Sequence, residues 1–101
     1  AASQGSAGAQ FYLGVMYKSG EGVTQNKSKA VEWFQKAAIQ GSAGAQLNLG
    51  TMYNNGDGVA QDRSKAVEWF QKAASQGIAE AQREVQISSK QFIEKVYDFF
   101  K

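Results

Sequence analysis

The chain has 101 residues, of which 43% are apolar and 20% charged, enough for one small globular domain. Its formal net charge of +2 is too small to indicate nucleic-acid binding, and no apolar run approaches the roughly 20 residues that span a bilayer. Neither Cys nor His is present, which excludes disulfides, thiolate chemistry and the commonest general base and metal ligand.

The sequence repeats itself with a period of 36 residues. Residues 1–36 and 37–72 are identical at 26 of 36 positions, and a third copy begins at Ala73 but departs from the pattern after Gln82. Residues 1–5 match the end of the second helix in later copies. We therefore expect the chain to start inside a repeat and to be the C-terminal piece of a longer array.

The first segment of each unit, about residues 6–19 and again 42–55, is predicted to be a helix with one buried stripe. No Pro interrupts it, and a glycine-rich loop at 20–23 or 56–59 ends it, because Gly adopts the left-handed conformation common at helix C-termini. The stripe residues recur at helical spacing. They are Ala9, Leu13, Met16, Tyr17 and Gly20.

The second segment is predicted to be a helix that begins after the N-caps Asn26 and Asp62 and ends at Gly41 and Gly77. Its apolar face recurs in both copies. The face consists of Ala30, Trp33, Phe34, Ala37 and Ala38, repeated as Ala66, Trp69, Phe70, Ala73 and Ala74.

Gly14 and Gly50 lie in mid-helix, where Gly costs roughly 1 kcal/mol relative to Ala, so we expect another helix to approach closely there. A single hairpin cannot bury its apolar face alone. Stacked hairpins would form a continuous core.

Charged residues of the second helix have two interpretations. Glu32 with Lys36 is predicted to be an ion pair that supports the helix, and Glu68 with Lys72 repeats it. A basic stripe could attract an acidic segment or could be an ordinary solvated face. The stripe comprises Lys27, Lys29, Arg63 and Lys65.

Residues 13–17 and 30–34 fit the L-G-x-x-Y and A-x-x-x-F halves of the tetratricopeptide pattern, as do 49–53 and 66–70. The longer period, the G-x-G-V loop and the K-A-V-E-W-F-Q-K-A-A-x-Q-G segment closely resemble the Sel-1-like repeat family, over residues 1 to about 82. The resemblance implies an all-α fold, an α/α solenoid of stacked antiparallel helix hairpins, used as an adaptor or scaffold. Some bacterial members are disulfide-linked, and this Cys-free chain departs from them.

The positions of the first helix that differ between the copies lie beyond about 100° from Leu13 on a helical wheel. In related solenoids this helix lines the concave groove, so the varied arc is our candidate site for a protein or peptide partner. Ordinary solvent-facing surface is the alternative. The candidate residues are Phe11, Tyr12, Val15, Lys18, Leu47, Asn48, Thr51 and Asn54, and Ser19 and Asn55 vary beside them.

The C-terminal stretch is unusually aromatic. Ser88 followed by Gln91 resembles a capping box, after which we expect a C-terminal capping helix that shields the last hairpin. The alternative is a docking helix for another subunit, a partner or a membrane surface. Its apolar residues are Phe92, Ile93, Val96, Tyr97, Phe99 and Phe100.

The sequence does not match the patterns that are typical of catalytic or ligand-binding sites. Gly20-Glu21-Gly22 follows a helix and lacks the Gly-Lys-Ser/Thr of a phosphate loop, and a calcium loop around Gly58 would put Tyr53 where a carboxylate is required. Without His the familiar hydrolase constellations cannot be assembled. We predict no enzyme activity, no cofactor and no metal.

We divide the chain into residues 1–5, the end of a preceding second helix; 6–41 and 42–77, two repeats; and 78–101, a partial third repeat with the capping helix. The predicted function is a protein-interaction scaffold that presents a first-helix groove. The alternative is a structural end segment that self-associates through its aromatic C-terminal helix. No signal peptide is visible, and we expect a soluble protein whose compartment stays open.

Overall fold

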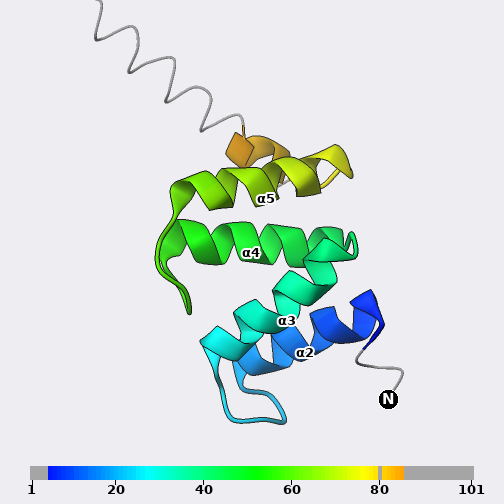
Figure 1. Ribbon diagram of the computed structural model, residues 1–101, viewed down its shortest axis with the longest axis vertical. Helices are drawn as coiled ribbons and strands as arrows, with labels where there is room; N and C mark the ends of the chain where they lie inside the picture. The colour runs from blue at the N-terminus through cyan, green and yellow to red at the C-terminus, as the bar shows by residue number, and fades with distance from the viewer. Residues whose placement is uncertain (1–4, 80, 86–101) are drawn as a thin grey trace, which may run out of the picture.

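The computed structural model describes residues 5–79 and 81–85 (Figure 1). Four helices of equal length follow one another: α2 (Ala7–Ser19), α3 (Lys27–Ile39), α4 (Ala43–Asn55) and α5 (Arg63–Ser75). Residues 79 and 81–85 are helical too. Within these ranges the fold is all-helical, as the sequence predicts, whereas the predicted capping helix at 88–101 lies outside the described residues.

The helices begin and end at the capping residues that the sequence predicts. Asn26 and Asp62 accept backbone N–H bonds from residues three positions on, at 3.0 and 3.1 Å, which satisfies donors that a helix leaves unpaired. Gly20 and Gly56 end α2 and α4 in the left-handed conformation, at φ 80° and 69°. These cap predictions are confirmed.

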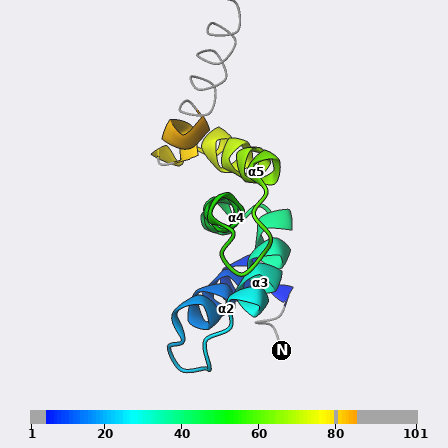
Figure 2. The ribbon, with the colours of Figure 1, turned by 90° about the vertical axis from the view of Figure 1, so that its left-hand side faces the viewer.

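The helices stack as two antiparallel hairpins. α2 packs on α3, α4 packs on α5, and α3 also packs on α4, so α4 lies between α3 and α5 along the stack (Figure 1). Figure 2 shows α2 and α4 on one side and α3 and α5 on the other. We name these sides the first-helix layer and the second-helix layer.

Each hairpin closes over a glycine. A Cβ added to Gly14 would lie 2.6 Å from the ring of Phe34, and one added to Gly50 would lie 2.7 Å from the ring of Phe70. Both rings are buried, so they have no room to move aside. The predicted close approach is confirmed, and the ring contact offsets the helix propensity that each Gly costs.

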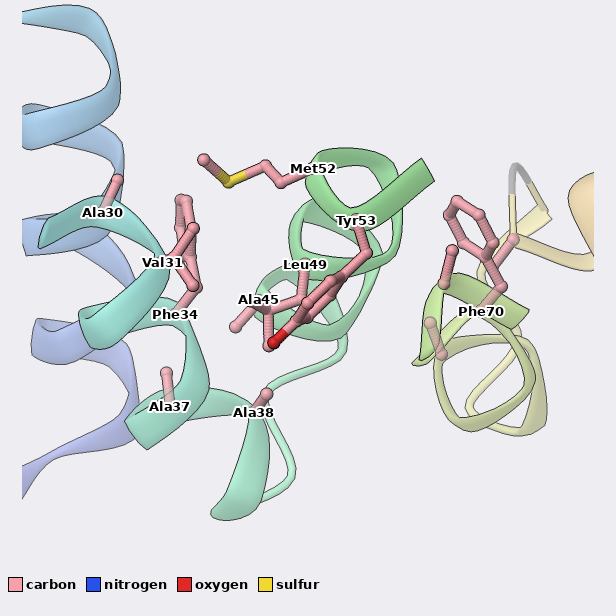
Figure 3. Close-up of a cluster of buried hydrophobic side chains, with 13 residues drawn as sticks. Ala30, Val31, Phe34, Ala37, Ala38, Ala45, Leu49, Met52, Tyr53 and Phe70 are labelled. Atoms are coloured by element: carbon pink, nitrogen blue, oxygen red, sulfur yellow. The ribbon is translucent and has the colours of Figure 1, made fainter. Parts of the chain in front are cut away.

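The core is deepest where α3 meets α4. Val31 and Phe34 of α3 face Leu49 and Met52 of α4 (Figure 3), and the last three are completely buried. Burying side chains of this size contributes about 1.5–3 kcal/mol each. Trp33, predicted to belong to the apolar face of α3, is only half-buried, and Val31 takes the buried place instead.

The two copies of the first-helix stripe differ in burial. In α4 the residues Leu49, Met52 and Tyr53 are at most 5% exposed because α3 covers them. Their equivalents in α2, Leu13 and Met16 among them, are only half-buried. The expected buried stripe is therefore found in α4, except at Gly56, whereas in α2 the stripe is only partly buried.

Candidate partner-binding surface

The candidate surface is the side of the first-helix layer that faces away from α3 and α5. Here α2 packs directly on α4. Phe11 lies over Gly44, where an added Cβ would come within 3.1 Å of its ring, and Lys18 Nζ donates a hydrogen bond to Asn48 Oδ1 at 3.3 Å. The two helices thus form one continuous surface.

The predicted residues fall into three groups by exposure. Tyr12 is 66% exposed and Val15 37% exposed. The polar residues are half-buried; these are Lys18, Asn48, Thr51 and Asn54. Phe11 and Leu47 are half-buried and pack against the hydrophobic core.

Phe11 and Leu47 were expected on the outer face of the first helix, but both side chains pack against the hydrophobic core. The Phe11 ring lies 5.8 Å from that of Phe34, tilted by 46°, and also covers Gly44. The helical wheel gives the angle of each residue from the stripe that faces the second helix of the same hairpin. In the stack, α2 also contacts α4, the first helix of the next hairpin, and a wheel of one helix cannot show this additional contact.

The polar side chains on α4 are held by their own helix. Asn48 Nδ2 donates to the Gly44 carbonyl at 2.8 Å, and Thr51 Oγ1 donates to the Leu47 carbonyl at 3.1 Å. Because the Asn48 amide is oriented in this way, its oxygen points at the Lys18 ammonium. Asn54 Nδ2 has only a long contact, 3.5 Å, to Asn55 Oδ1.

Three of the four basic residues of the second-helix layer have structural partners. Lys27 Nζ lies 2.9 Å from Asp57 Oδ1 of the next hairpin, while Lys29 and Lys65 each lie 5.5 Å from a Tyr ring centre. The described part of the chain therefore favours the ordinary reading of the basic stripe, with Arg63 exposed at the start of α5.

The predicted Glu–Lys ion pairs of α3 and α5 are wrong. Lys36 Nζ lies 4.5 Å from the ring centre of Trp33, and Lys72 lies 4.6 Å from that of Trp69. Within residues 5–79 and 81–85 the ion pair formed is Lys27–Asp57. Charge spacing alone does not reveal that a Trp three positions earlier attracts the same ammonium group.

Sequence reasoning missed a set of buried glutamines. Gln46 is 5% exposed; its Nε2 donates to the Ala38 carbonyl at 3.1 Å, and its Oε1 accepts from Gln76 at 2.9 Å. One repeat earlier Gln40 donates to Gln10 at 2.7 Å. The 36-residue recurrence of both positions was the signal available in the sequence.

The candidate surface offers side chains that can contact another molecule. Among the described residues, no three of the side chains of His, Cys, Asp or Glu gather where they could hold a metal ion. No helix in the same ranges has the length and apolar character to cross a membrane. What the surface offers is an exposed aromatic ring, an aliphatic side chain, a lysine and several amides.

The family model described as "Sel1 repeat" matches residues 7–42 and 43–78. The chain belongs to the Sel1 repeat family. Its two matches begin one residue later than the units that we delimited from the sequence. Sel1 repeats generally serve as protein–protein interaction modules, and the family is generally non-catalytic.

Two solved structures of Sel1 repeat proteins are similar to this chain. One, from Oxalobacter formigenes, is 41% identical over 81% of the chain with a TM-score of 0.79. The other, a protective antigen of uropathogenic Escherichia coli strains, is 45% identical over 77% with a TM-score of 0.76. The chain spans 34% and 17% of their respective lengths. No curated protein sequence matches the chain.

Proposed function

We propose that this chain is an interaction module that binds a protein or peptide partner on the exposed side of its first-helix layer. The observation that carries the proposal is the exposure of two apolar side chains there. Tyr12 and Val15 lie three positions apart on α2, hence on one face, at 66% and 37% exposure. Exposed aromatic residues with apolar neighbours anchor interfaces more often than other surface residues do.

The rest of the layer suits a partner with polar groups. Lys18 is half-buried, and among the described residues its ammonium contacts the neutral Asn48 amide and no carboxylate. Thr51 and Asn54 continue the polar surface along α4. A partner segment with an apolar side chain for Tyr12 and hydrogen-bonding groups for the amides would match this arrangement.

Photo-crosslinking tests the site directly. A photoreactive phenylalanine analogue at position 12 is compared with the same analogue at Ile39, which is 78% exposed but lies on α3. In lysate of the native host we expect a defined protein adduct from position 12 and none of that mass from position 39. The Tyr12→Ala, Val15→Ala double variant should lose the partner in a pull-down, and the Ile39→Ala variant should retain it. Equal adducts from both positions would contradict the proposal.

The alternative is self-association through the aromatic C-terminal segment. Residues 88–101 lie outside the described residues, so no contact described above favours it. Sedimentation across a concentration series separates the alternatives. A mass that stays at 10.9 kDa argues against self-association, and a mass that rises with concentration argues for it.

A further inference from the structure

The last residue of α4 is an asparagine that precedes a glycine. Asn55 is exposed, and Gly56 begins the loop that leads to α5 (Figure 1). Because glycine has no Cβ, the neighbouring side chain can approach its backbone nitrogen closely. Asn26, Asn48 and Asn54 instead precede Lys, Leu and Asn, whose side chains hinder that approach. We infer that Asn55 is a site of spontaneous deamidation and that the end of α4 controls its rate.

The reaction needs this peptide segment and water. The Gly56 nitrogen gives up its proton to a base in solution and attacks Cγ of the Asn55 side-chain amide. As the new N–Cγ bond forms, the Cγ–Nδ2 bond breaks, and the amino group takes up a proton and leaves as ammonia. Water then opens the succinimide ring at either of its carbonyl carbons, which gives aspartate or isoaspartate. The net change replaces an amide with a carboxylate, and nothing is oxidised or reduced.

In the folded protein the attacking nitrogen is engaged elsewhere. The Gly56 N–H donates to the Met52 carbonyl, and the Asp57 N–H donates to the same oxygen at 2.9 Å. Gly56 itself is fixed in the left-handed conformation, at φ 69° and ψ 38°. Because the amide proton is held in a hydrogen bond, the last turn of α4 has to open before the nitrogen can attack.

The following loop holds this turn closed. Gln61 Nε2 donates to the Asn54 carbonyl at 2.7 Å, and the Asp62 N–H donates to the Tyr53 carbonyl at 2.9 Å. The Gln61 side chain also packs against Gly56, where an added Cβ would lie 3.2 Å from the Gln61 Cβ. Carbonyls of the last turn have no partner within their own helix, so these bonds from the loop resist its opening.

The first repeat contains the same contact without the reactive residue. Gln25 Nε2 donates to the Lys18 carbonyl at 2.8 Å, 36 residues before its counterpart. Ser19 stands at the position equivalent to Asn55. The chain therefore provides its own control, in which an equal loss of a loop contact leaves the deamidation site untouched.

The product would weaken the turn that controls its formation. A carboxylate at position 55 lies at the C-terminal end of α4, where the helix dipole disfavours negative charge. It also lies two residues from the Asp57 carboxylate. Deamidation should therefore loosen the end of α4. The inference is independent of the proposed function, because the reaction needs no partner.

Peptide mapping by mass spectrometry tests the site. The 101-residue chain is aged in mildly alkaline buffer, and each peptide is followed for the replacement of NH by O. We expect this change first at Asn55. In guanidinium chloride sufficient to unfold the chain, the rate at Asn55 should rise about ten-fold or more, because unfolding releases the Gly56 N–H. Equal rates in the folded and unfolded chain would overturn the inference, and so would slower reaction at Asn55 than at Asn26 or Asn48.

Two glutamine variants test the control by α4. Gln61→Ala removes the donor to the Asn54 carbonyl and should speed deamidation of the folded chain about two- to ten-fold, with no change in guanidinium chloride. Gln25→Ala removes the equivalent donor from the first repeat and should leave the rate at Asn55 unchanged. Circular dichroism establishes that both variants are folded. Equal acceleration by the two variants would overturn the role of the α4 end.

Discussion

At the scale of single residues, stability depends on large and small side chains that face each other. Phe34 and Phe70 fill the spaces left by Gly14 and Gly50, and neither ring can retreat. Gly8, by contrast, lies on the exposed side of α2, where the one described atom within 4 Å of an added Cβ is the Ser6 hydroxyl oxygen, at 3.8 Å. Glycine is therefore needed for close packing at positions 14 and 50, whereas the packing around position 8 does not require it.

Because of this contrast, we expect alanine substitutions at Gly50 and Gly8 to change the free energy of unfolding in opposite directions. Gly50→Ala should destabilise the protein by about 1–2 kcal/mol, because overpacking against Phe70 outweighs the gain in helix propensity. Gly8→Ala should stabilise it by up to about 1 kcal/mol. Urea denaturation followed by circular dichroism measures both. A stabilised Gly50→Ala variant would show that α4 and α5 can move apart without cost.

The tyrosine hydroxyls offer a second matched pair. Tyr53 is buried and its hydroxyl accepts from Gln35 Nε2, whereas the Tyr17 hydroxyl has no hydrogen bond to any residue in the described ranges. Tyr53→Phe should cost about 0.5–1.5 kcal/mol, and Tyr17→Phe close to nothing. Equal midpoints in thermal unfolding for the two variants would contradict this expectation.

At the scale of elements, the positions of the helices and their caps could be predicted from the sequence. The contacts between one helix and the next could be predicted only in part. The bounds of α2 to α5 follow from Asn26, Asp62 and the glycine loops, because these signals act within a few residues of the helix end. The inward place of Phe11 was not predictable from one helix, because it depends on Gly44 of the next hairpin. The contribution of the candidate site to binding stays a prediction.

The loop between α4 and α5 is held to the start of α3 by the Lys27–Asp57 pair. The side chains are 45% and 32% exposed, so their coupling in a double-mutant cycle should be small, about 0.2–1 kcal/mol, and weaker at high salt. The cycle uses Lys27→Ala and Asp57→Ala. Salt-independent coupling would mean that the contact is mainly one of packing, since the Gly58 backbone lies against Lys27.

At the scale of the whole molecule, the two hairpins contact each other through α3 and α4, and the described helices differ in how many neighbours cover them. α4 is covered by α3 on one side and by α5 on the other. Among the described helices, α2 packs fully against α3 and contacts α4 only at its edge. Solenoids of this kind behave as one-dimensional arrays, in which interior units gain from two interfaces and terminal units from fewer.

Hydrogen exchange should reveal this gradient. Amides of residues 49–53 in α4 should exchange more slowly than the equivalent amides 13–17 in α2, because opening α4 disrupts contacts with both flanking helices. Equal protection of both segments would show that the described helices unfold as a single unit.

The fixed 36-residue step between a covering helix and the face that it covers also bears on inheritance. Residues 28–38 of α3 and 64–74 of α5 are identical in sequence, so recombination between two copies of the coding sequence rejoins equivalent helices. A duplication or deletion of 36 residues would keep the glycine pockets and the Lys27–Asp57 type of contact in register. Arrays built this way can change length in one genetic step without inventing a new interface.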